Sequence, residues 1–131
     1  MGDGAGYLSQ GTGPVAIGAN AGYLNSKTNN VAIGYNAAQY NAVGSSVSIG
    51  LNAAQTGQQV LSVAIGTNSG QIVQGTSAIA VGTNAGQYTQ GSNAISIGYA
   101  SGNLGQANSN TAVGYASNYQ STGTLAIAIG N

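Results

Sequence analysis

Val63-Ala64-Ile65-Gly66-Thr67-Asn68-Ser69 decides the fold, because a version of this stretch recurs every sixteen residues along the 131-residue chain. The third position of each copy is Ile or Val, and the fourth is always glycine. The copies begin, without insertion or deletion, at Val15, Val31, Val47, Val63, Ile79, Ile95, Thr111 and Ile127. A fixed period indicates a repeat array in which neighbouring units complete one another. We therefore expect residues 1–131 to form a single repeat domain with a partial leading rung at residues 1–14.

Each copy combines a strand pattern with a turn pattern. The triplet Val63-Ala64-Ile65 alternates as a β-strand does, with its first and third side chains on one face and its small second side chain on the other. Glycine and asparagine follow, and these residues tolerate positive φ best, so a tight turn is expected after the strand. A column of asparagines is predicted to stack as an amide ladder. Its members are Asn20, Asn36, Asn52, Asn68 and Asn84.

The second half of each copy predicts a weaker strand, as in Gln71-Ile72-Val73-Gln74-Gly75. One position there is mostly apolar, although it is polar at Thr56 and Gln120. Its apolar members are Leu8, Leu24, Tyr40, Ile72, Tyr88 and Leu104. Identical register in successive copies means parallel stacking with rungs about 4.8 Å apart. The predicted fold is all-β, a parallel β-solenoid (β-roll) of about eight 16-residue rungs with two short strands in each rung.

The small second position of the triplet predicts a surface for lateral self-association. We expect the bulky first and third side chains to be buried, and Ala or Ser at the second position to let a neighbouring sheet approach closely. The residues concerned are Ala16, Ala32, Ser48, Ala64, Ala80, Ser96, Ala112 and Ala128. The alternative is that this column is exposed without a partner.

The two ends of the chain predict end-to-end stacking. The chain stops in mid-motif, so that Ile127, Ile129 and Gly130 would present an unpaired strand edge, and Met1 and Gly2 lie in the matching phase of the repeat. Uncapped edges are templates for further strands.

Aromatic and apolar residues outside the strands are candidates for partner binding. Tyr7 and Tyr23 occupy equivalent positions on adjacent rungs, as do Tyr99 and Tyr115, so each pair is expected to stack. Aromatic ladders can dock a surface glycan or a protein, but more often they stabilise a sheet. Leu61 follows Val60 at a site that is polar in most copies, which indicates either a binding patch or a variation in packing.

Composition excludes most kinds of chemistry. Only Asp3 and Lys27 are charged, and the chain has no His and no Cys. General acid–base catalysis and metal binding rely on these residue types, so we expect no enzyme activity, no cofactor and no metal. One lysine cannot neutralise the phosphates of a nucleic acid. No apolar stretch is long enough for a membrane-spanning helix. With so few charges there is little repulsion between copies, which favours self-association.

The copies at Leu61-Ser62-Val63-Ala64-Ile65-Gly66-Thr67-Asn68-Ser69 and Asn93-Ala94-Ile95-Ser96-Ile97-Gly98 resemble the head repeat of trimeric autotransporter adhesins, the YadA-like head. The resemblance implies a left-handed β-roll, three chains side by side, binding of host matrix proteins, and a place outside the cell. The collagen-associated pattern NSVAIG-x-x-S of that family is approached from Leu61, which replaces its asparagine, to Ser69. Leu61 and Ser69 therefore join the candidate partner-binding residues.

Two non-enzymatic functions are consistent with these patterns. The first is the head or shaft of an adhesive fibre on a cell or virion surface, since the repeats are also similar to those in the shafts of viral and phage fibres. The alternative is a filament subunit that polymerises end to end.

Overall fold

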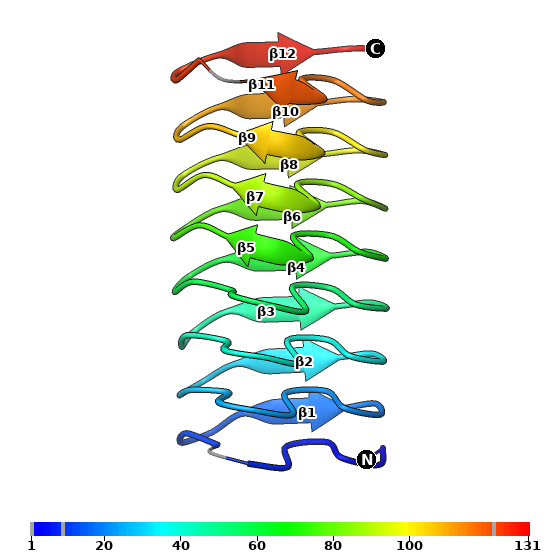
Figure 1. The fold of residues 1–131 in the computed structure, drawn as a ribbon, viewed down its shortest axis with the longest axis vertical. Coiled ribbons are helices and arrows are strands. Elements are labelled where there is room, and N and C mark those ends of the chain that lie inside the picture. Colours follow the sequence, from blue (N-terminus) through cyan, green and yellow to red (C-terminus); the bar gives the residue numbers. More distant parts are fainter. Residues whose placement is uncertain (1, 9, 122) are drawn as a thin grey trace.

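The chain is wound into a rod of parallel β-strands. The computed structural model describes residues 2–8, 10–121 and 123–131, and none of these residues is helical. They form a parallel β-solenoid of about seven turns, with the N-terminus at one end of the rod and the C-terminus at the other (Figure 1). The predicted fold class is confirmed.

The main sheet contains one strand from each of the eight sequence copies and has the order β1-β2-β3-β4-β6-β8-β10-β12. Its strands are β1 (Val15–Ile17), β2 (Val31–Ile33), β3 (Val47–Ile49), β4 (Val63–Ile65), β6 (Ile79–Val81), β8 (Ile95–Ile97), β10 (Thr111–Val113) and β12 (Ile127–Ile129). All pairs are parallel and in register, so that Val15 pairs with Val31 and Ala16 with Ala32. The sixteen-residue sequence period is therefore the spatial period of the rod.

The second wall of the coil is regular only in its C-terminal half. It contains β5 (Ile72–Gln74), β7 (Tyr88–Gln90), β9 (Leu104–Gln106) and β11 (Gln120–Ser121). In the earlier rungs the predicted second strand is reduced to isolated parallel bridges, which link Leu8, Leu24, Tyr40, Thr56 and Ile72 in turn. The regular strands begin with β5, one rung after Gln58. Gln58 is the first of a series of glutamines that occupy the same position of the repeat in consecutive rungs. In two of the earlier rungs the equivalent residues, Ser26 and Ala42, are too short to cross the interior.

A glycine follows each main-sheet strand, and from Gly18 to Gly114 the backbone of the next rung leaves no room for a side chain. Gly66 has a φ of 125°, and a Cβ atom placed on it would lie 2.8 Å from the carbonyl carbon and oxygen of Gly82 in the next rung. The backbones therefore approach too closely for any side chain. Asn68, two residues later, has a φ of 55°, as expected for the predicted turn.

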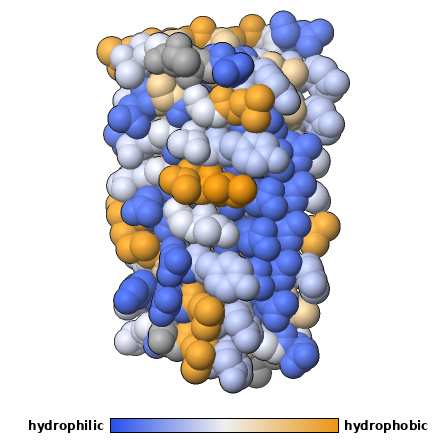
Figure 2. Space-filling view, viewed as in Figure 1, coloured by the Kyte–Doolittle hydropathy of each residue, from blue (hydrophilic) through white to orange (hydrophobic). Residues whose placement is uncertain are grey.

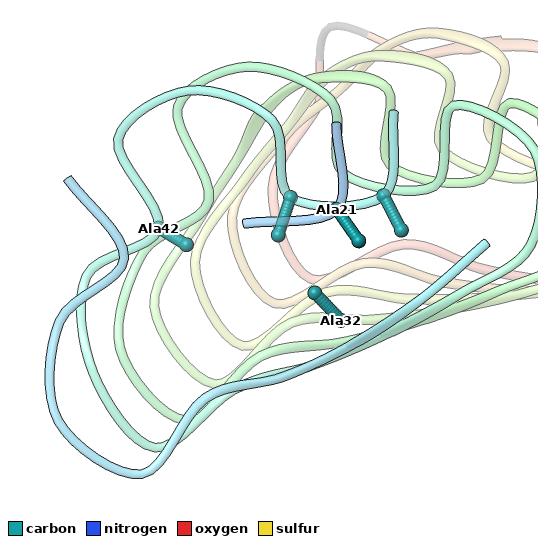
Figure 3. Close-up of a cluster of buried hydrophobic side chains, with 5 residues drawn as sticks. Ala21, Ala32 and Ala42 are labelled. Atoms are coloured by element: carbon teal, nitrogen blue, oxygen red, sulfur yellow. The ribbon is translucent and has the colours of Figure 1, made fainter. Parts of the chain in front are cut away.

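Small side chains fill the interior, and the predicted orientation of the strands is wrong. Ala32, Ser48, Ala64, Ala80, Ser96 and Ala112 are buried, while Ala16 and Ala128 in the terminal rungs are partly covered. Figure 3 shows Ala21 and Ala32 on opposite walls, both directed into the space between them. A sixteen-residue coil leaves little room between its walls, so Ala and Ser fit inside and the bulky Val and Ile side chains face outward.

Glutamines form a polar spine through the C-terminal half of the interior. Gln58, Gln74, Gln90 and Gln106 are buried, and each donates from Nε2 to a backbone carbonyl of the opposite wall. They also bond to one another along the rod, over 3.4 Å from Gln58 to Gln74 and 3.2 Å for the next two steps. These side chains are long enough to join the walls, and their amides are satisfied without water.

Candidate functional site

The outward side chains of the main sheet form a continuous aliphatic surface. We call this surface the aliphatic face and define it as the first and third residues of β1, β2, β3, β4, β6, β8, β10 and β12. Fifteen of its sixteen residues are Val or Ile, and Thr111 is the exception. None of them is buried; Ile65 is 38% and Ile97 is 40% exposed in the middle of the sheet.

Three properties of the aliphatic face suit it to contact with another flat surface. Its eight strands are in register, so identical or similar side chains stand in two straight columns. Rungs about 4.8 Å apart give it a length of roughly 35–40 Å. Neither of the two charged residues, Asp3 and Lys27, belongs to it. Monomeric soluble proteins rarely expose a contiguous apolar patch beyond a few hundred Å².

The predicted lateral interface is therefore on the wrong side of the strands. Ala64 has no exposed surface, and its column cannot contact another chain unless the rod opens. The sequence correctly predicts that the small second residue of each strand faces away from the bulky first and third residues. The side chains that a partner can reach, however, are those of Val and Ile.

Two further amide ladders run along the rod, apart from the buried glutamine spine. The predicted asparagine ladder is confirmed: each Nδ2 from Asn20 to Asn68 donates to Oδ1 of the next asparagine over 3.1 Å, ending at Asn84. A second ladder, which the sequence analysis missed, joins Gln39, Gln55, Gln71, Gln87 and Asn103. Its signal was available, since glutamine recurs there at intervals of sixteen. Figure 2 shows a continuous hydrophilic column along one side of the face that carries β5, β7 and β9.

Both predicted tyrosine stacks are present. The ring centroids of Tyr7 and Tyr23 are 5.0 Å apart with planes inclined by 9°, and those of Tyr99 and Tyr115 are 5.3 Å apart at 12°. Tyr40 contacts Tyr23 edge to face, with centroids 6.5 Å apart. Each stacked ring covers one face of its neighbour. That face is then closed to a sugar, while the outer edges of the pairs stay exposed.

The other two candidate partner-binding residues differ in accessibility. Leu61 is 61% exposed and lies in a turn with a φ of 60°, so its side chain is open to a partner. Ser69 is fully buried and donates from Oγ to the carbonyl oxygen of Gly66 over 2.9 Å. The prediction for Ser69 is wrong, because this serine closes the turn from inside. The signal was present in the sequence: the equivalent position is Ala or Ser in every full copy, as at Ala53 and Ala85.

Of the residues predicted for end-to-end stacking, Ile127, Ile129 and Gly130 lie in the last rung and Gly2 lies in the first. β12 is hydrogen-bonded to β10 only, and the side chains of Ile127 and Ile129 are more than 70% exposed. Gly130 donates to the carbonyl oxygen of Val113, so the last rung keeps the register of the others. Gly2 packs against the backbone of Gly18 and Ala19, and Met1 lies outside the described residues.

Within the described ranges there is no pocket, and no group of three or more His, Cys, Asp or Glu that could hold a metal ion. No helix suited to crossing a membrane occurs in that part of the chain. Comparisons with protein-family models, with curated proteins and with solved structures found no match.

Proposed function

We propose that this chain is a structural segment of a fibre, a rod that associates side by side with copies of itself through the aliphatic face. The observation that carries the proposal is the outward orientation of fifteen Val and Ile side chains in two straight columns. A second copy supplies a surface of the same length, spacing and chemistry, so each rung meets apolar side chains along the whole rod.

The energetics favour this partner. Complete burial of a Val or Ile side chain contributes about 1.5–3 kcal/mol, and even about 1 kcal/mol from each of fifteen partly covered residues totals about 15 kcal/mol. Loss of translational and rotational freedom costs about 4–15 kcal/mol. The aliphatic face also has no charged group to desolvate, and Thr111 is its only hydroxyl.

The resemblance to adhesin head repeats supports three further parts of the proposal. It favours a trimer over a dimer, a location outside the cell, and adhesion to a host matrix protein or surface glycan. In such an assembly the aliphatic faces meet at the axis and the second wall faces outward, with Leu61 and the Tyr7–Tyr23 pair accessible to a partner. The rod itself acts as a non-enzymatic scaffold.

Growth from the ends is a second candidate function, and the in-register parallel pairing of β12 with β10 favours it. A rung added on Ile127–Ile129 would continue the main sheet with the same parallel pairing. Ile129→Pro leaves the interior untouched but prevents that pairing. It should therefore shorten the filaments seen by electron microscopy without changing how many rods associate side by side. Filaments of unchanged length in this variant would contradict end-to-end growth.

The chain offers a matched pair of residues for testing the lateral interface. Ile65 lies on the aliphatic face and Ile72 on the second wall, and their side chains are 38% and 40% exposed. Sedimentation velocity should show oligomers for the unaltered protein and for Ile72→Lys, but monomers for Ile65→Lys. Circular dichroism would establish that both variants stay folded. An unaltered chain that is monomeric at all accessible concentrations, or an Ile65→Lys variant that still forms oligomers, would exclude the interface.

A further inference from the structure

Two stacked tyrosine pairs carry a redox chemistry that the proposed fibre function does not require. We propose that Tyr7–Tyr23 and Tyr99–Tyr115 are oxidative modification sites, at which a one-electron oxidant of the peroxidase type joins adjacent rungs through a dityrosine bond. The inference does not depend on how the rods associate.

Geometry brings the reacting atoms together before any oxidation takes place. The centroid distances of 5.0 and 5.3 Å and interplanar angles of 9° and 12° hold the two rings of each pair next to each other and nearly parallel. The in-register backbone holds this arrangement, since Ile97 two residues before Tyr99 pairs with Val113 two residues before Tyr115. Preorganised neighbours react far faster than partners that must meet by diffusion.

The chemistry balances with a peroxide as the terminal oxidant. Each phenol loses one electron and its hydroxyl proton, and the two phenoxyl radicals couple through the ring carbons ortho to the oxygens. The hydrogens on those two carbons then move to the oxygens, which restores both phenols. Two tyrosines and one hydrogen peroxide thus yield one dityrosine and two waters.

The composition and exposure of the chain direct oxidation to these rings. The chain has eight Tyr but no Trp, no Cys and no His, and its one Met is the first residue. Tyr7 is 60% exposed and Tyr115 is 62% exposed, so an external oxidant reaches one ring of each pair. Tyr7 precedes Leu8 of the second wall, and this pair stays accessible when the aliphatic face is covered.

Tyr35 is a natural control. It occupies the same position of the repeat as Tyr99, and its exposed fraction of 53% is similar to the 50% of Tyr99. Its neighbours along the rod in that column are Ala19 and Leu51, so it has no adjacent ring with which to couple. Exposure alone therefore does not make a site; a stacked partner on the next rung is required.

The test treats dilute protein with a haem peroxidase and hydrogen peroxide, then measures intact mass, dityrosine fluorescence and migration on a denaturing gel. The variants are Tyr7→Phe, Tyr115→Phe, the double variant and Tyr35→Phe. We expect the unaltered chain and Tyr35→Phe to lose two hydrogens for each pair and to migrate as monomers. Each single-pair variant should keep one bond, and the double variant should form none.

Three outcomes would overturn the proposal. The first is absence of hydrogen loss in the unaltered chain under conditions that couple free tyrosine. The second is equal hydrogen loss and fluorescence in the double variant, which would show that stacking is irrelevant. The third is dityrosine found only in covalent dimers, which would place the reaction between rods. A cross-linked chain should also unfold at a higher denaturant concentration than the same chain before oxidation, because each bond closes a loop between adjacent rungs.

Discussion

Gln74 lies in one wall of the solenoid and donates from Nε2 a 2.7 Å hydrogen bond to the carbonyl oxygen of Val63 in the other wall. The same amide donates to Oε1 of Gln90 over 3.2 Å. One buried side chain thus holds the two walls together and links successive rungs. Every buried apolar side chain among the described residues is an alanine, so such bonds take the place of a conventional hydrophobic core.

We expect Gln74→Ala to destabilise the rod by about 2–4 kcal/mol, since it leaves buried polar partners unsatisfied and opens a cavity. Urea unfolding followed by circular dichroism measures the change. Gln59→Ala is the control, because Gln59 is exposed on the same rung as buried Gln58 and should alter stability by less than about 0.5 kcal/mol. Equal effects of the two substitutions would show that the spine contributes nothing particular to stability.

Gly66→Ala should prevent the native stacking of rungs. Its Cβ atom would meet the backbone of Gly82 at 2.8 Å, and backbone cannot move aside as a flexible side chain can. The expected loss is at least about 3 kcal/mol, at the upper end of what single substitutions produce. Gly123→Ala serves as the control, since nothing lies within 4 Å of a Cβ atom at that position. Thermal unfolding of the two variants decides the matter, and a fully stable Gly66→Ala protein would refute the close approach.

Val73→Asn should stabilise the rod. Val73 is a β-branched residue with a φ of 55°, while the same position of the repeat is occupied by Asn25 and Asn41 in two earlier rungs. Relief of the left-handed strain is expected to contribute about 1 kcal/mol. Val60→Asn, at an exposed valine without positive φ, should give no such gain. A denaturation midpoint that falls or stays unchanged in Val73→Asn would contradict the strain at this residue.

Asn52→Asp should destabilise the asparagine ladder in a pH-dependent way. The new carboxylate has no proton to donate to Oδ1 of Asn68, which accepts a 3.1 Å bond from Asn52 in the native chain. A protonated carboxyl can restore that bond, so the variant should gain stability relative to the native protein as the pH falls. Asp3 is the only natural acidic side chain, so the stability of the native protein should depend little on pH in this range. Urea unfolding at neutral and acidic pH tests this, and a stability difference independent of pH would argue against the ladder bond.

The sequence period was sufficient to predict the solenoid, its parallel register, the asparagine ladder and both tyrosine stacks, because each depends only on residues being one repeat apart. It was not sufficient to predict which side of a strand faces inward. Alternation separates Val63 from Ala64 but does not assign either to the interior; that depends on the width of the coil, which appears only when the second wall is in place. The prediction for Ser69 failed for a different reason: it rested on the adhesin resemblance and overlooked the column of Ala and Ser to which Ser69 belongs. The positive φ of Val73 in the second strand could not be predicted either, since a β-branched residue rarely adopts it.

The inverted placement of small and bulky side chains has a consequence for heat capacity. Unfolding usually raises heat capacity by about 12–15 cal/mol/K per residue, mainly through exposure of apolar surface to water. A single rod leaves its Val and Ile side chains half-buried or exposed, so the heat-capacity change of its own unfolding should fall below that value. If rods associate through the aliphatic face as proposed, that association adds a heat-capacity change of its own. Since apolar contacts weaken on cooling, cold should separate the rods while each of them stays folded.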